Sequence, residues 1–137
     1  MKATFTIYGT PIAKKRPRFS RRGNFVTTYN SQETEEGRWL LSARGEMRNN
    51  GLNAPIESPV AMSMLFLLPI PASASKKRLR EIEDSPAHTK KPDLDNLQKF
   101  ALDCLNGELY RDDSQIYEIT ARKEYGKQAL TEITVEW

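Results

Sequence analysis

Apolar residues recur at steps of three and four along residues 94–106, a pattern that predicts an amphipathic helix. Asp93 or Asp95 suits its start, because an aspartate oxygen accepts hydrogen bonds from the free N–H groups of the first turn. Gly107 suits its end, because glycine readily adopts the left-handed conformation. The apolar stripe that would face a core consists of Leu94, Leu97, Phe100, Ala101, Cys104 and Leu105.

Two more helices are predicted upstream of this one. Residues 31–49 begin with a glutamate-rich turn after Asn30 or Ser31, either of which can act as the cap. The apolar stripe of that segment is Trp39, Leu40, Ala43 and Met47. Residues 73–84 predict a short, highly charged helix with a serine cap, and residues 85–92 connect it to the helix at 94–106.

The strand pattern predicts a sheet that these helices cover. Residues 2–8 alternate polar and apolar β formers, and residues 58–69 form an apolar run bounded by prolines, typical of a buried strand. Residues 115–125 and 130–136 predict a hairpin. Residues 12–30 are expected to be a long loop, which is usually functional or flexible. The order predicts an α+β fold with a small mixed β-sheet packed with helices on at least one face.

Composition narrows the class of protein. A chain of 137 residues predicts a single domain, residues 1–137, large enough for an ordinary core. The only cysteine, Cys104, excludes an intramolecular disulfide, fits a reducing cytoplasm and is expected in the core. No signal peptide or membrane span is recognised, so a cytoplasmic location is expected. His88 is expected to be an exposed loop residue; its place upstream of Asp93 keeps a metal or base role as the alternative.

The net charge of +3 is modest, but the cations are clustered. Basic loops with aromatic residues between them attract a phosphate backbone, although each cluster could equally be a solvated loop. Phe19, Phe25 and Tyr29 could stack on unpaired bases or simply pack. The candidate DNA-binding residues are Lys14, Lys15, Arg16, Arg18, Arg21, Arg22, Lys76, Lys77, Arg78, Lys90 and Lys91.

Two aspartates at the start of the helix at 94–106 and two after its end form a candidate metal site: Asp93, Asp95, Asp112 and Asp113. If Asp93 lies in the extended segment and Asp95 at the cap, both carboxylates can converge. A tight exit at the end of the helix would bring Asp112 or Asp113 back to them. Hard carboxylate oxygens are the ligands that Mg²⁺ and Mn²⁺ prefer. Such ions polarise a phosphoryl oxygen and lower the pKa of a bound water.

Lys99 is one turn beyond Asp95 and could stabilise negative charge on a phosphorus centre. The ordinary alternatives are a helix cap, an Asp95–Lys99 surface pair contributing about 0.2–0.5 kcal/mol, and an Asp-Asp turn before a strand. Spacing alone leaves both interpretations open.

The segment KPDLDNLQKFALDCLNG, followed by YRDDSQI, resembles the signature of the RusA family of Holliday junction resolvases. The opening GTPIAKKRPRF also resembles the start of that family, whereas residues 30–90 resemble it weakly. Asp93 and Asp95 match the family's metal-binding aspartates, and Lys99 matches a lysine on the same helix. The third catalytic aspartate matches Asp112 or Asp113, with Asp113 favoured.

The resemblance implies a homodimeric, Mg²⁺-dependent endonuclease, with Mn²⁺ as a possible substitute, that nicks opposed strands of a four-way DNA junction in recombination and repair. Two matched cuts call for two sites related by a two-fold axis. The strand at 58–68 or the helix at 94–106 is expected to contribute to the dimer surface. By analogy, the setting would be bacterial or phage. The alternatives are a non-catalytic DNA-binding module and a metal nuclease acting on other branched or single-stranded DNA.

Overall fold

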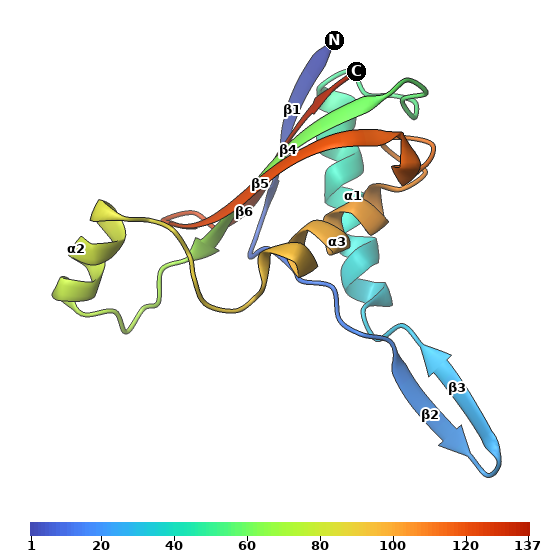
Figure 1. Cartoon of the computed structure of the whole chain (residues 1–137), viewed down its shortest axis with the longest axis horizontal. Coiled ribbons are helices and arrows are strands. Elements are labelled where there is room, and N and C mark those ends of the chain that lie inside the picture. The colour runs from blue at the N-terminus through green and yellow to red at the C-terminus, as the bar shows by residue number, and fades with distance from the viewer.

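The computed structural model describes residues 1–137 and combines helices with two β-sheets (Figure 1). This confirms the predicted α+β fold with a mixed sheet. In chain order the elements are β1 (Lys2–Tyr8), β2 (Arg18–Arg22), β3 (Phe25–Tyr29), α1 (Glu33–Asn49), β4 (Val60–Pro69), α2 (Lys76–Asp84), α3 (Leu94–Leu105), the 3-10 turn η1 (Asp113–Gln115), β5 (Ile116–Gly126) and β6 (Leu130–Glu136).

The main sheet has the strand order β1-β6-β4-β5, with β4 and β5 parallel and the other pairs antiparallel. The predicted hairpin of the last two strands is therefore wrong, because β4 lies between β5 and β6. β4 is the most apolar strand, and it lies between two partner strands that hydrogen-bond its backbone N–H and C=O groups. These groups can therefore be buried away from water. At the end of β5, Gly126 lies so close to Leu67 that an added Cβ would be 3.0 Å from the Leu67 Cβ.

The helices α1 and α3 pack on one face of the main sheet. Trp39 of α1 meets Phe100 of α3 edge-to-face, with ring centroids 5.8 Å apart. The predicted stripe of α3 is buried from Leu97 onward, and that of α1 is buried at Trp39, Ala43 and Met47. Alternate residues of β4 complete this core: Val60, Met62, Met64, Phe66 and Leu68.

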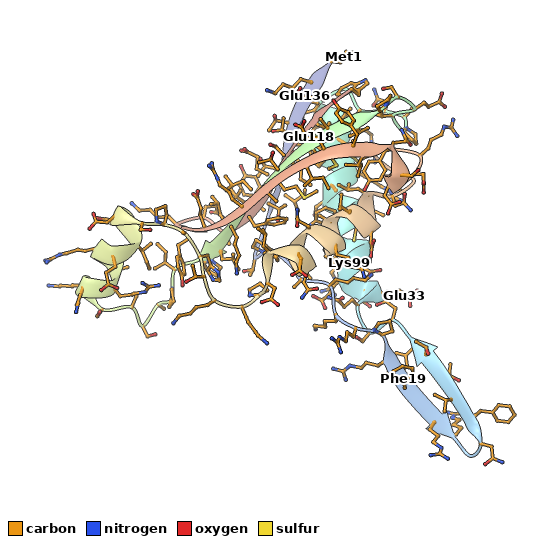
Figure 2. All side chains as sticks on the ribbon, viewed as in Figure 1. Met1, Phe19, Glu33, Lys99, Glu118 and Glu136 are labelled. Carbon is orange, nitrogen blue, oxygen red and sulfur yellow. The ribbon has the colours of Figure 1, made fainter.

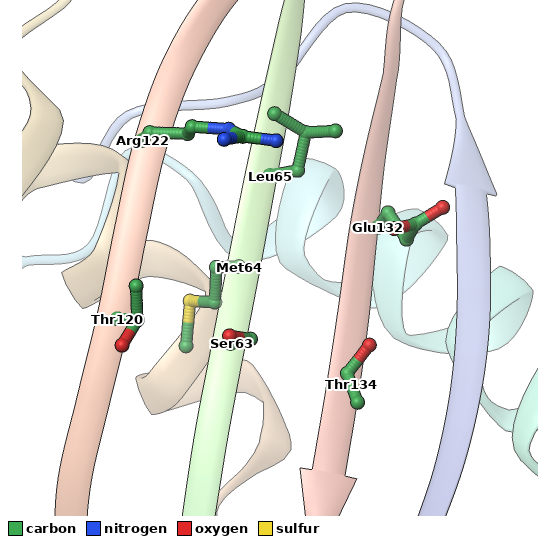
Figure 3. Close-up of a pocket in the computed structure, with 7 residues that line it drawn as sticks. All are labelled: Ser63, Met64, Leu65, Thr120, Arg122, Glu132 and Thr134. Atoms are coloured by element: carbon green, nitrogen blue, oxygen red, sulfur yellow. The ribbon is translucent and has the colours of Figure 1, made fainter.

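The opposite face of the main sheet is polar and carries no helix. Side chains of β4, β5 and β6 line a shallow depression there (Figure 3): Ser63, Leu65, Thr120, Arg122, Glu132 and Thr134. One buried and one solvated face is common when strands alternate apolar and polar residues. The mixed charges leave this face without the positive character that a phosphate backbone requires.

Residues 18–29, expected to be loop, instead form the antiparallel β2–β3 hairpin. Its two-residue turn is Gly23–Asn24, and the φ of +58° at Gly23 is of a kind that only glycine adopts freely. This hairpin, called the arm below, projects away from the rest of the molecule (Figure 1). The missed signal was the Gly23–Asn24 pair, which suits a two-residue hairpin turn, followed by the β-forming run Phe25–Tyr29. The partner strand β2 contains only one β former, Phe19.

Candidate metal centre and nucleic-acid surface

Asp93 is the N-cap residue of α3, with extended backbone angles, and Asp95 lies in the first helical turn. Both side chains are exposed. The sequence suggested that one of them caps the helix, yet the Asp93 carboxylate makes no capping hydrogen bond. Its oxygens therefore remain free for a ligand at the positive end of the helix dipole.

The segment that leads into Asp93 is tied to the sheet. Lys123, on β5, donates from Nζ to the backbone carbonyl oxygens of Lys90 and Pro92, the second at 2.6 Å. One step upstream, the His88 backbone N–H donates to the Lys123 carbonyl at 3.1 Å. The position of Asp93 thus depends on a lysine that lies 30 residues later in the chain.

His88 is buried beneath this segment, so the expectation of an exposed loop residue is wrong. Its ring packs against Tyr125 with centroids 4.6 Å apart, and Nδ1 has no hydrogen-bond partner. Burial, together with the nearby charge of Lys123, lowers the pKa of His88. The sequence around His88 gave no signal for burial, because the contact with Tyr125 depends on β5.

Asp112 and Asp113 differ in what their side chains do. Asp112 caps η1: its carboxylate accepts from the backbone N–H and the hydroxyl of Ser114, and these bonds lower its pKa. Gln115 closes the capping box by accepting from the Asp112 backbone N–H at 2.8 Å. Asp113 donates its backbone N–H to Asn106 at 3.0 Å, while its carboxylate has no hydrogen-bond partner. Asp113 is therefore the free member of the pair.

The aspartates at the two ends of α3 do not meet within one chain. Asp113 is bonded to Asn106, the C-cap residue, whereas Asp93 is the N-cap residue. At about 1.5 Å per residue, the 12-residue helix separates its ends by about 18 Å. No group of three His, Cys, Asp or Glu side chains has an arrangement that could hold a metal ion. The expectation that Asp113 returns to Asp93 and Asp95 is wrong for a single chain. The reason is that η1, which leads directly into β5, lies at the C-terminal end of α3.

Lys99 is exposed on α3 and points away from the core (Figure 2). No ion pair joins it to Asp95, so the ordinary surface pair is not formed. Asp103, one helical turn beyond Lys99, forms an ion pair with Lys14 at 3.4 Å. The Lys99 ammonium remains available to a ligand near the start of α3.

The predicted basic cluster at 14–22 divides into two parts. Lys14 lies between α1 and α3, 3.0 Å from Glu36; burial opposes its charge, but Glu36 and Asp103 raise its pKa above the usual value. Lys15 pairs with Glu35 at 3.6 Å. These two lysines have partners inside the protein. The four arginines that follow are exposed and form no ion pair: Arg16, Arg18, Arg21 and Arg22.

The segment that leads into the arm, residues 13–15, is called the stem and is anchored beside the start of α3. Lys14 donates its backbone N–H to the Asn96 carbonyl at 2.9 Å. Gln32, the N-cap residue of α1 in place of the expected Asn30 or Ser31, is buried and binds the stem from the other side. Its side chain accepts from the Lys15 N–H at 2.6 Å and donates to the Ala13 carbonyl at 2.8 Å.

The remaining predicted cations lie on the other side of Asp93. Lys90 and Lys91 are exposed directly before it, and Lys76 and Lys77 are exposed on α2. Arg78 bonds to Tyr125 and Glu81, both at 3.3 Å, which makes it partly structural. The carboxylate pair at the start of α3 therefore has basic residues on both sides. Cys104 has no part in this surface, since burial raises the pKa of its thiol to about 12.

An α+β fold that presents a free carboxylate pair at a helix start, between exposed cations, defines a candidate metal-dependent nuclease. The sequence matches the family described as Endodeoxyribonuclease RusA over residues 8–136, and the chain belongs to that family. It is 31% identical over 134 residues to YqaN of Bacillus subtilis (strain 168), described as an uncharacterized protein; the match covers 96% of this chain and 93% of that one.

Family membership makes this protein an endodeoxyribonuclease, a hydrolase of phosphodiester bonds. The family resolves Holliday junctions, acts on branched DNA and depends in general on divalent metal ions. No helix has the length and apolar character needed to cross a membrane.

Proposed function

We propose that this single-domain protein resolves four-way DNA junctions by paired nicks, using Mg²⁺ for which Mn²⁺ can substitute, in DNA recombination and repair. The proposed metal ligands are Asp93, Asp95 and Asp113, with Asp112 holding η1 in place. The observation that carries this proposal is that the Asp93 and Asp113 carboxylates are free of hydrogen bonds, whereas Asp112 is engaged.

The donor set fits a hard divalent ion. All the proposed ligands are carboxylates, and no histidine or cysteine competes for a softer metal at these positions. When bound, Mg²⁺ would offset the phosphate charge and lower the pKa of a bound water. Lys99, one turn beyond Asp95, is placed to stabilise the negative charge on the phosphorus centre.

One chain offers only two of these carboxylates at the start of α3, so the third must come from elsewhere. A homodimer with a two-fold axis would bring Asp113 of one chain to the α3 start of the other, and the reverse, forming two equivalent sites. Paired nicks on a four-way junction need such a pair of sites. The proposal therefore makes dimerisation a condition for metal binding.

The surface beside Asp113 supports this dimer. Tyr117 and Ile119 on β5 are 71% and 38% exposed, and they share a shallow depression with Leu102, Asp113 and Ile116. Exposed apolar residues gathered in one place commonly mark a protein interface. The predicted contributors, the 58–68 strand and the 94–106 helix, bury most of their apolar side chains in the core, although Leu102 of the helix lines this depression. The β5 surface is the better candidate for contact with a second copy.

The direct test is cleavage of a synthetic four-way junction with Mg²⁺, with flap and duplex DNA as substrate controls. Asp95→Asn should abolish nicking yet preserve or improve junction binding, because it removes a charge that repels phosphate. The matched control is Asp84→Asn, an exposed acid at the end of α2, nine residues before Asp93. A wild-type protein that binds junctions but never nicks them with Mg²⁺ or Mn²⁺ would refute the proposal. Preference for flap DNA would change the substrate and retain the chemistry.

Mixing two inactive variants tests the shared site. In a heterodimer of Asp95→Asn and Asp113→Asn chains, a site shared between chains would be doubly defective on one side and intact on the other. Mixing should therefore restore nicking of one strand. If each site were built from one chain, both sites would stay defective and mixing would restore nothing. Light scattering that shows a monomer at assay concentration would also refute the shared site.

A further inference from the structure

The arm, residues 18–29, has no partner in the protein. All ten residues of β2 and β3 are exposed. Its only side-chain hydrogen bond is internal, from Arg21 Nε to the Gly23 carbonyl. No ion pair ties it to the body. A two-stranded hairpin is at best marginally stable in water, so the arm is suited to becoming ordered against a ligand.

Each face of the arm carries arginine and at least one aromatic ring. The register pairs Arg18 with Tyr29 and Arg22 with Phe25, so these four side chains lie on one face. The other face presents Phe19 and the Arg21–Val26 pair. Phe19 and Phe25, on opposite faces, are 72% and 79% exposed. Hairpins that pack on a core have one apolar and one polar face; here each face combines an aromatic ring with arginine.

The positive charge of the arm favours nucleic acid as its ligand. No acidic residue occurs between Lys14 and Glu33. Arginine contacts phosphates and stacks on planar groups, and aromatic side chains stack on unpaired bases at about 1–3 kcal/mol per base. A ribbon lying against a duplex or a single strand would use mainly one of its faces. Two faces that each carry arginine and an aromatic ring suit a place where nucleic acid lies on both sides.

We propose that the arm inserts at the branch point of the junction, with Phe19 stacking on one side and Phe25 and Tyr29 on the other. This inference rests on the proposed function and adds how the branch is recognised. Arg18 and Arg22 on one face and Arg21 on the other contact phosphates of the two neighbouring DNA arms. The stem is bonded to Asn96 in the first turn of α3 through Lys14, so the arm begins four residues beyond a point held next to Asp95. Recognition of the branch and the site of cleavage are thereby held at a set separation.

The test compares the two faces with matched controls. Phe19→Ser and Phe25→Ser each remove a ring from one face, while Thr28→Ser and Thr27→Ser alter neighbours on those same faces. Binding is measured without divalent metal, to a four-way junction with 2-aminopurine at the branch point and to a duplex. Each phenylalanine variant should bind the junction at least about fivefold more weakly. Each should also lose the change in 2-aminopurine fluorescence that accompanies junction binding by the wild type. Duplex binding should be unchanged, and the threonine variants should behave as wild type.

Three outcomes would overturn the inference. Loss from only one face would mean that the arm lies flat on DNA. Normal junction binding by both variants would remove the arm from recognition. A change of oligomeric state by light scattering would show that the arm clasps a second copy instead. Since the arm adds nothing to the core, thermal unfolding of all variants should match wild type. Failure of the wild type to nick junctions would refute the proposed function separately, because branch binding is measured without cleavage.

Discussion

Lys123 Nζ donates to the Pro92 carbonyl oxygen at 2.6 Å, which ties the residue before Asp93 to β5. The same ammonium group bonds the Lys90 carbonyl, so one side chain fixes the segment at two points. Lys123 does not itself reach the proposed ligands. It acts on them by setting where α3 begins and where the Asp93 carboxylate lies.

Lys123→Met should therefore reduce cleavage more than binding. Residues that orient metal ligands typically matter by about 10- to 100-fold in metal affinity or activity. We expect a fall of that size in kcat, a higher Mg²⁺ concentration for half-maximal nicking, and junction affinity within about twofold of wild type. Lys123→Arg should recover part of the loss. The control is Lys127→Met, which removes an exposed lysine just after β5. A loss confined to KM would contradict a positioning role.

The neighbouring aspartates Asp112 and Asp113 should behave differently. Asp113→Asn should lower the rate of nicking by more than about 100-fold. Loss of a residue that only supports a metal ligand costs up to about 100-fold, and loss of a ligand should cost more. Asp112→Asn should stay within about threefold of wild type, because asparagine caps a helix about as well as aspartate. Single-turnover cleavage of a four-way junction measures both. The reverse order of effects would make Asp112 the ligand and Asp113 the structural residue.

Gln32 should matter for stability and for the arm. Its side chain is buried and bonds both Ala13 and Lys15. Gln32→Met keeps the volume but leaves those backbone groups unpaired, at a cost of about 1–3 kcal/mol in the free energy of unfolding. Urea unfolding gives this value. Gln128→Met is the control, since Gln128 is exposed and bonds only the adjacent Ala129. Equal stability of the two variants would contradict the proposed anchoring of the stem.

The buried His88 predicts a loss of stability in mild acid. Burial lowers its pKa in the folded protein, whereas the unfolded chain titrates near the ordinary value of about 6.5. Below that pH the unfolded state binds more protons than the folded state, so acid favours unfolding. The free energy of unfolding should fall from pH 7 to pH 5.5. His88→Phe, which retains an aromatic contact with Tyr125 but cannot titrate, should show a smaller fall. An identical slope in both proteins would assign the effect to other groups.

Local patterns predicted the parts of this structure that local physics decides. The apolar stripe of α3 and the alternation of β1 depend on residues a few positions apart, and both elements lie where the periodicity placed them. The preference for Asp113 over Asp112 came from the family resemblance. The structure adds a physical reason, since only Asp112 is engaged in a cap.

Features that depend on distant residues could not be predicted in this way. The sequence indicated two final strands with a short connection, but not that β4 lies between them. The residues near Asp93 do not predict the contact of its segment with Lys123, and those near His88 do not predict its contact with Tyr125. The separation of Asp93 from Asp113 follows from the length of α3 and the direction in which η1 leaves it. An acidic sequence pattern therefore identifies candidate ligands without deciding which of them meet in one chain.

The strand order has a consequence for how the molecule is made. Every ladder of the main sheet includes β5 or β6: β1 pairs with β6, and β4 pairs with both. During synthesis, the apolar β4 therefore has no strand partner until the ribosome has added residues 116–136. Long-range pairing of this kind slows folding and prolongs the exposure of apolar, aggregation-prone surface. Newly made chains are expected to need protection by chaperones until that final stretch arrives.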